Sequence, residues 1–164
     1  MEPSSEAELK RGYRQARIIG MVMVFSVLVY AVIVELMSNN PGFSEEPLLP
    51  DGADFIKYIF LGLAFIQFFV IRMIRRRFLS WESRQATSLR TEVVSTRTAK
   101  LLIASIITYA LCESIAIFGL ILFFLTRSPF DFYLFMGISL LYFAAYFPRY
   151  AQWEEWVVGR QNTN

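Results

Sequence analysis

Four apolar stretches alternate with polar segments along the chain. They comprise residues 18–37, 58–71 with Met73 and Ile74 beyond, 101–125 and 132–147. A helix that crosses a membrane needs about 20 mostly apolar residues, because each residue adds about 1.5 Å and the hydrocarbon layer is about 30 Å thick. Two of the stretches are shorter, but flanking aromatic and long basic side chains can reach the interface. The pattern predicts an all-α integral membrane protein with four transmembrane helices.

Basic residues gather in three of the polar segments. Residues 1–17 contain four of them, residues 72–100 contain eight and residues 148–164 contain two, whereas the other two loops hold only Lys57 and Arg127. Loops rich in Lys and Arg stay in the cytoplasm. We therefore expect a cytoplasmic N-terminal tail, a first transmembrane hairpin, a basic cytoplasmic loop, a second transmembrane hairpin and a cytoplasmic C-terminal tail. These five parts correspond to residues 1–17, 18–74, 75–100, 101–147 and 148–164.

The basic middle loop begins with a cluster of four arginines. A Lys or Arg close to a membrane surface contributes about 1 kcal/mol of attraction to anionic lipid. We predict that these residues contact anionic headgroups: Arg72, Arg75, Arg76 and Arg77. Anionic lipid is enough to explain such a cluster beside a membrane, so we expect no nucleic-acid partner. The expected partners are the lipid bilayer and either other membrane subunits or a second copy of the chain. Short loops without a processing signal favour a multi-pass protein of a bacterial inner membrane, although an organelle of bacterial descent would look alike.

Several kinds of chemistry are excluded or disfavoured by composition. The chain has no histidine, which excludes Ser-His-Asp catalysis and His-ligated haem. Cys112 is the single cysteine, so no disulfide forms within the chain. Carboxylates are isolated in the apolar stretches or scattered in loops, and none has an obvious partner for acid–base work. We expect no enzymatic activity, no metal and no cofactor.

The two halves of the chain align with each other. Residues 26–41 match residues 114–129 at an offset of 88, and residues 55–68 match residues 130–143 at an offset of 75. In the second alignment Gly62 meets Gly137 and Tyr58 meets Tyr133. This predicts two tandem helical hairpins, related by an axis along the membrane normal. The alternative is that any two apolar helices can be slid into partial agreement.

Glu113 is the most informative residue of the sequence. It lies in the middle of the third apolar stretch, about 18 Å from either end of a helix of that length. A central acidic side chain costs about 2.5–3.5 kcal/mol on insertion, so it usually faces a partner or a water-filled path. Burying a charge without a cation is costly, so we expect Glu113 to be mostly uncharged. Candidate residues for a proton or cation site around it are Gln67, Tyr109, Tyr30 and Tyr142.

A helical wheel divides the third stretch into two faces. Small and polar residues share an arc of about 140° with Glu113, and we expect them to pack against other helices: Ser105, Thr108, Tyr109, Cys112, Ala116 and Gly119. Small residues let helix backbones approach closely in a membrane. The opposite face is expected to meet lipid, and it carries Ile103, Ile107, Ala110, Leu111, Ile115 and Ile121.

Residues 110–130, ALCESIAIFGLILFFLTRSPF, resemble the carboxylate-bearing helix of the proteolipid c subunit of rotary ATP synthases. The matching elements are Glu113, Ala116, Ile117, Phe118, Gly119, Leu120, Ile121, Pro129 and Phe130. The resemblance implies that Glu113 occupies the place of the proton- or sodium-binding carboxylate. It covers about one eighth of the chain, and the rest lacks the family's Gly repeat and its Arg-Gln-Pro loop.

Two functions follow as hypotheses. In the first, the chain is a non-catalytic small subunit or accessory protein of a membrane complex, packed through the Glu113 face of the third helix. In the second, it translocates a proton or cation with Glu113 as the membrane-embedded carboxylate. Binding of a lipid or small hydrophobic ligand between the hairpins is a further class, with no dedicated sequence feature.

Overall fold

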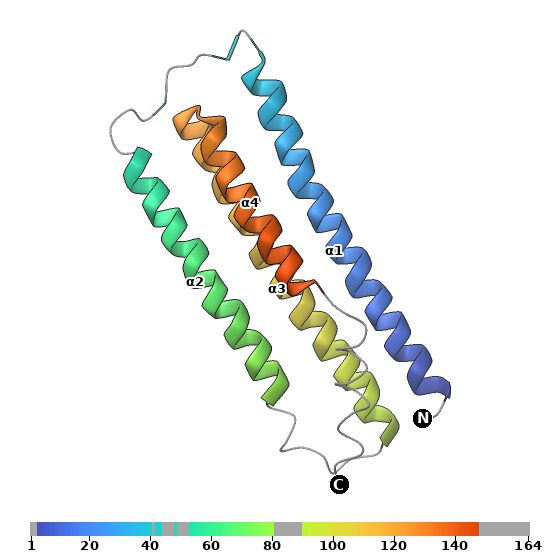
Figure 1. Ribbon diagram of the computed structural model, residues 1–164. Coiled ribbons are helices and arrows are strands. Elements are labelled where there is room, and N and C mark those ends of the chain that lie inside the picture. The colour runs from blue at the N-terminus through green and yellow to red at the C-terminus, as the bar shows by residue number, and fades with distance from the viewer. Residues whose placement is uncertain (1–2, 41, 44–47, 49–52, 81–89, 148–164) are drawn as a thin grey trace.

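The fold is all-α, as the sequence predicts. The computed structural model describes residues 3–40, 42–43, 48, 53–80 and 90–147. These residues form four helices: α1 (Pro3–Ser38), α2 (Ala53–Ser80), α3 (Arg90–Thr126) and α4 (Pro129–Tyr146). Figure 1 shows them as long rods running up and down the molecule. Within the described part of the chain, all four are long and apolar enough to cross a membrane.

The helices extend beyond the apolar stretches at the basic end. α1 begins at Pro3, α2 continues to Ser80 and α3 begins at Arg90, so much of the expected N-terminal tail and middle loop is helical. At about 1.5 Å per residue, α1 and α3 are each about 55 Å long, well over the thickness of a hydrocarbon layer. The expected C-terminal tail, residues 148–164, lies outside the described residues.

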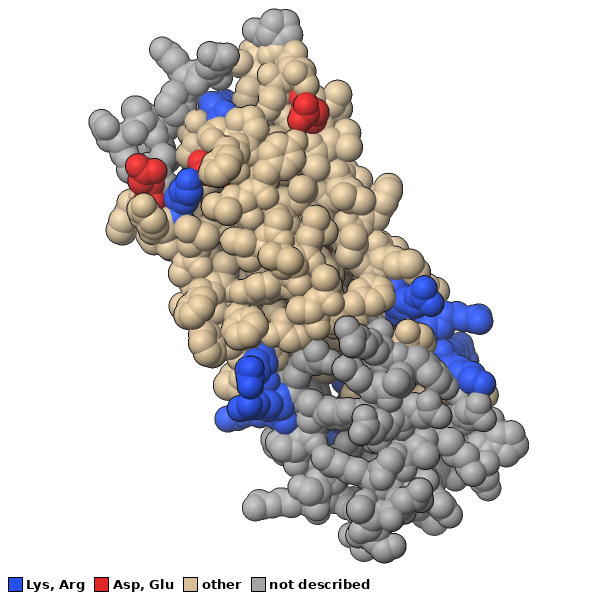
Figure 2. Space-filling model, in the orientation of Figure 1, with Lys and Arg blue, Asp and Glu red and all other residues tan. Residues whose placement is uncertain are grey.

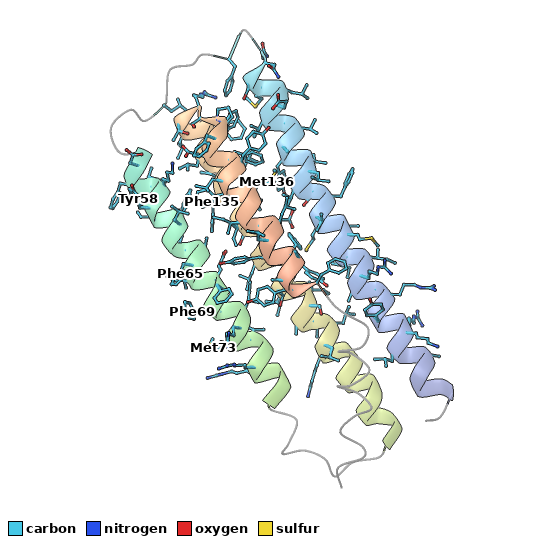
Figure 3. All side chains as sticks on the ribbon, viewed as in Figure 1. Tyr58, Phe65, Phe69, Met73, Phe135 and Met136 are labelled. Carbon is cyan, nitrogen blue, oxygen red and sulfur yellow. The ribbon has the colours of Figure 1, made fainter. Side chains whose placement is uncertain are left out.

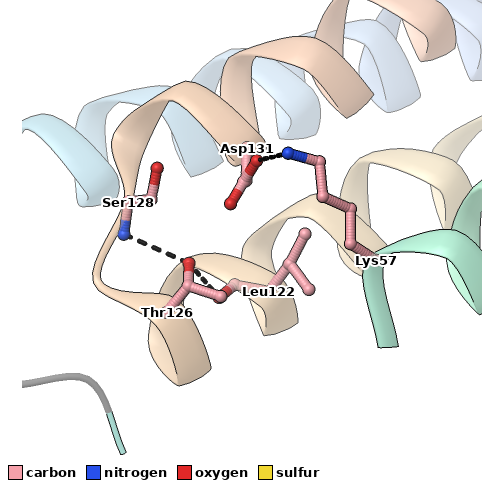
Figure 4. Close-up of polar contacts among 5 residues, drawn as sticks. All are labelled: Lys57, Leu122, Thr126, Ser128 and Asp131. Carbon is pink, nitrogen blue, oxygen red and sulfur yellow. Dashed lines mark hydrogen bonds and ion pairs between the residues drawn. The ribbon is translucent and has the colours of Figure 1, made fainter. Parts of the chain in front are cut away.

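A tight turn joins α3 to α4. Arg127 ends α3 with a φ of 59°, and its N–H donates to Phe123 O over 2.8 Å. Ser128 then takes an extended conformation and Pro129 occupies the first turn of α4, where a missing N–H costs nothing. The Ser128 N–H donates to Thr126 Oγ1 over 3.2 Å (Figure 4). The turn therefore forces α3 and α4 to run antiparallel as neighbours.

Helix α3 is the centre of the bundle. It contacts α1, α2 and α4, and α1 also contacts α4. Within the described residues, no Cα atom of α1 comes within 8 Å of one of α2, and the two helices flank the α3–α4 pair on opposite sides (Figure 1). The first two helices thus do not form a packed hairpin like the second two, which differs from the expected pair of similar hairpins.

α3 and α4 approach each other closely at Gly119. A Cβ atom on Gly119 would lie 2.7 Å from Phe135 Cβ and 3.1 Å from Phe132 O. By contrast, Gly62 and Gly137, the glycines paired by the internal alignment, have open space around the position of a Cβ. The aligned glycines therefore have no common packing role.

The lipid-facing surface expected for α3 is only partly correct. Ile103, Ile107 and Ile121 are exposed, but Ile115 is fully buried in a cluster with Ala64 and Phe135. α2 packs against α3 on the side opposite to α1, and it covers the part of α3 that contains Ile115. α2 itself turns large side chains outward, among them Tyr58, Phe65, Phe69 and Met73 (Figure 3).

Charges on the surface are divided between the two ends. Figure 2 shows Lys and Arg side chains gathered at the lower end of the described surface. The exposed cations of the described residues at the start of α1, the end of α2 and in α3 include Lys10, Arg11, Arg14, Arg17, Arg72, Arg76, Arg77 and Lys100. The side chain of Arg75 is outside the described part. Glu35 and Asp54 are exposed near the other end, and Figure 2 shows a broad uncharged band between. This band is where a bilayer would fit.

Candidate functional site

Glu113 is half-buried and hydrogen-bonded to α1. Ser26 Oγ and Tyr30 OH are both within hydrogen-bond distance of Glu113 Oε1, and Tyr30 OH donates to it over 2.9 Å. Ser26 and Tyr30 are four residues apart, so they lie one above the other on one face of α1. Two hydroxyl groups of α1 therefore converge on one oxygen of the carboxyl group.

The residues on either side of Glu113 reach the other two helices. The Cys112 carbonyl accepts from Ser139 Oγ of α4 over 2.7 Å. Ser114 Oγ accepts from Gln67 Nε2 of α2 over 2.8 Å. We call Cys112, Glu113 and Ser114 the α3 node. Consecutive residues point about 100° apart around a helix, so the α3 node bonds each of the other three helices at one depth.

The expected partners of Glu113 are only partly brought together. Tyr30 reaches the carboxyl group, as described above. Gln67 instead donates to Ser114, and its Oε1 atom is buried without a hydrogen-bond partner in the described residues. Tyr142 OH donates to Ala64 O of α2 over 3.2 Å. Tyr109 is buried beside Gly20, and its ring stacks on Phe143 with centroids 6.0 Å apart.

The small and polar face of α3 is buried for most of its length. Thr108, Cys112, Ala116 and Gly119 are buried, and Ser105 is half-buried. The hydroxyl groups of Ser105 and Thr108 donate to carbonyls of their own helix, at 2.9 and 2.8 Å. On this face, close packing thus comes from Ala116 and Gly119, and the links between helices come from the α3 node.

Sequence reasoning did not identify the serines that complete the site. Ser26, Ser114 and Ser139 each hydrogen-bond across a helix pair, yet serine is common in membrane helices and gives no distinct signal. The spacing of Ser26 and Tyr30 was the one usable clue, since it places both on the face that carries the expected tyrosine.

A second polar contact lies at the end opposite the basic cluster. Lys57 Nζ of α2 forms an ion pair with Asp131 Oδ1 of α4 at 2.5 Å, and Asp131 is buried (Figure 4). Tyr133 OH of α4 donates to Glu35 Oε2 of α1 over 2.9 Å. The Arg127 guanidinium lies 3.8 Å from the centroid of the Phe43 ring. These contacts hold α1 and α2 to the α3–α4 turn.

The fold defines the class of protein, a four-helix bundle whose helices are long and apolar enough for a multi-pass membrane protein. No family model, curated protein or solved structure matches the chain. The resemblance of residues 110–130 to the proteolipid c subunit therefore stays a prediction.

Proposed function

We propose that the chain is a non-catalytic small subunit or accessory protein of a membrane complex, in which Glu113 holds the protein's own helices together. The α3 node is the observation that carries this proposal. Its three residues are each bonded to a different helix, so the polar groups in the middle of the bundle serve its assembly. The face of α3 that carries Glu113 is covered by α1, which leaves other faces for a partner.

The hydrogen bonds of Ser26 support an uncharged Glu113. Ser26 Oγ is 2.8 Å from Met23 O and also contacts Glu113 Oε1. A hydroxyl group has one hydrogen, so it cannot donate to both oxygens at once. Both contacts are satisfied together when the carboxyl group carries the proton and shares it with Ser26. A glutamine amide would make the same contact.

Substitutions at the site test the structural role. Glu113→Gln keeps the shape, and its amide nitrogen has two N–H groups that can donate to the hydroxyl oxygens of Ser26 and Tyr30, so we expect an unchanged thermal midpoint in detergent and unchanged migration of the complex in native gels. The double variant Ser26→Ala with Tyr30→Phe removes both partners of the carboxyl group. Hydrogen bonds between membrane helices contribute about 0.6–1.7 kcal/mol each, so we expect a loss of about 1–3 kcal/mol. Tyr58→Phe, on the exposed face of α2, is the matched control.

A second candidate function is translocation of a proton or cation through Glu113. The favouring observation is that two hydroxyl groups, from Ser26 and Tyr30, surround the carboxyl group of Glu113, which is only half-buried. Loss of a proton-coupled activity in Glu113→Gln, with an intact complex, would establish this function and reject the purely structural role. Labelling of Glu113 by a hydrophobic carbodiimide would show that the carboxyl group is reachable.

The proposed location is a bacterial-type inner membrane with both termini in the cytoplasm. Support comes from the separation of charges, since the exposed arginines of α1 and α2 share one end of the bundle (Figure 2). The same arginines are proposed to contact anionic headgroups. Protease accessibility of tags at either terminus, in inverted and right-side-out vesicles, tests the orientation.

A further inference from the structure

The two oxygens of the Glu113 carboxyl group have different surroundings. Both hydroxyl groups of α1, Ser26 Oγ and Tyr30 OH, contact Oε1. No hydrogen bond joins Oε2 to a described residue, and Oε2 is not one of the buried side-chain atoms that lack a partner. An atom that is neither bonded nor buried is open to its surroundings. The second oxygen of Glu113 is therefore accessible, at the middle of the apolar part of α3.

The neighbours of Glu113 on α3 show the side to which this oxygen opens. Ala110 and Ile117 lie three residues before it and four after it, and both are exposed. Tyr109 and Ala116 lie four residues before it and three after it, and both are buried. Residues at these spacings flank a helical residue on its two sides. Tyr109 packs against α4, so α4 covers one side of Glu113 and the other side is open.

α1 is exposed on the same side. Val22 and Val29 lie four residues before Ser26 and three after it, and they are 62% and 40% exposed. α1 and α3 both begin at the basic end, so they run in the same direction (Figure 1). Successive residues turn in the same sense on both helices, so these sides of two parallel helices adjoin. We call the gap between them the α1–α3 opening, which is lined by Val22, Val29, Ala110 and Ile117.

The open oxygen calls for a hydrogen-bond donor that is carried by an apolar molecule. When the carboxyl group shares its proton with Ser26 through Oε1, Oε2 is an acceptor. Acyl chains offer no donor, and an unsatisfied polar group is costly in hydrocarbon. No cation of the described residues pairs with Glu113. Hydrogen bonds between charged groups are about twice as strong as neutral ones, so an ammonium group is the donor that would gain most here.

We propose that the α1–α3 opening binds a lipid-soluble primary amine, whose nitrogen donates to Glu113 Oε2. The amine enters from hydrocarbon in its neutral form and takes the proton of the carboxyl group, which leaves an ammonium–carboxylate pair. Ser26 then turns its hydrogen from Met23 O to Oε1, so the carboxylate keeps both contacts with α1. This goes beyond the proposed function, because the group that fastens α1 to α3 through one oxygen binds a ligand through the other.

Labelling of Glu113 by dicyclohexylcarbodiimide tests the proposal, with the full chain in phosphatidylcholine nanodiscs and n-decylamine as the probe. We expect Glu113 to be labelled, and n-decylamine to slow the labelling at least fivefold by mass spectrometry. Ala110→Trp, which fills the α1–α3 opening, should slow the labelling to a similar degree without amine. Leu63→Trp on the exposed face of α2 is the matched control, and it should leave the rate unchanged.

Two relatives of the probe separate its features. n-Decanol has the same chain with a neutral donor, and decyltrimethylammonium has a charge without an N–H group. We expect each to slow the labelling less than twofold. Equal protection by n-decanol would overturn the amine as the class of ligand, and equal protection by decyltrimethylammonium would overturn the hydrogen bond to Oε2. Absence of labelling, or absence of protection by n-decylamine, would reject the site.

Thermal midpoints keep this inference apart from the proposed function. n-Decylamine should raise the midpoint of the natural chain but not that of Glu113→Gln, because an amide has no acidic proton to give to the amine. A rise in both would show binding elsewhere and reject the site. The structural role of Glu113 is read from the midpoints without amine, in Ser26→Ala with Tyr30→Phe, so either proposal can fail while the other stands.

Discussion

The second pair of helices and the first pair have similar sequences but pack differently. α3 and α4 are joined by Arg127 and Ser128 and meet closely at Gly119. α1 and α2 are joined by residues 39–52, and their described residues stay apart. A short connection makes two helices neighbours, whereas a longer one lets another element lie between them. Similar apolar patterns therefore do not ensure similar packing, and the length of the connection decides which helices meet.

Gly119→Leu should disrupt the packing of α3 against α4, and we expect it to have the largest effect on stability. The new side chain would meet Phe135 Cβ and the backbone of Phe132, and backbone cannot move aside cheaply. Overpacking typically costs 1–3 kcal/mol, and we expect a loss of about 3 kcal/mol by SDS titration of the reconstituted protein. Gly62→Leu in α2, which has open space, is the control. Equal losses in the two variants would contradict the difference between the pairs.

Lys57→Met should weaken the attachment of α2 to the bundle, which depends on side-chain contacts more than the packing of α3 against α4 does. Removing one member of a buried ion pair leaves the other charge uncompensated, at a cost of 3–5 kcal/mol when burial is complete. Lys57 is partly exposed, so we expect about 2 kcal/mol. Asp131→Asn in the same background should recover part of the loss, because it removes the stranded charge. No recovery in the double variant would show that the two side chains do not act as a pair. Unfolding free energies of the single and double variants measure this coupling.

Two conservative changes at the α3 node should have small and unequal effects. Ser139→Ala removes the hydrogen bond from α4 to the Cys112 carbonyl and should cost about 0.6 kcal/mol. Gln67→Leu removes the bond to Ser114 but also the unpartnered Oε1 atom, so we expect a change of about zero in the chain alone. Unfolding curves of both variants in one detergent give the difference. A larger loss in Gln67→Leu than in Ser139→Ala would overturn this ranking.

The four helices could be predicted from the sequence because long apolar stretches are a direct consequence of the hydrocarbon thickness. The contact of Tyr30 with Glu113 was also foreseeable, since both lie at one depth. The position of α3 in the centre was not. Ile115 is buried and Ile117 is exposed, yet the two side chains are identical, so an apolar helix carries no mark of which side meets protein and which meets lipid.

The polar contacts were likewise only partly predictable from the sequence. Lys57 of α2 is one of only two basic residues in the segments that join the first to the second and the third to the fourth apolar stretch, but its pairing with Asp131 of α4 depends on how these two helices are placed in three dimensions. The serines of the site gave no such hint. Glu113 and Ser114 lie at nearly the same depth but point about 100° apart around the helix. An estimate of depth alone therefore could not decide which of the two Gln67 would contact.

The burial of Cys112 has a practical consequence for spectroscopy. Its side chain is fully enclosed, and it is the one cysteine of the chain. A thiol introduced on the outer face of α1 or α2 would therefore be the first to react with a maleimide or a nitroxide reagent, with the native residue left in place. Pairs of such labels would report the separation of α1 from α2 in liposomes without any prior replacement of the natural thiol.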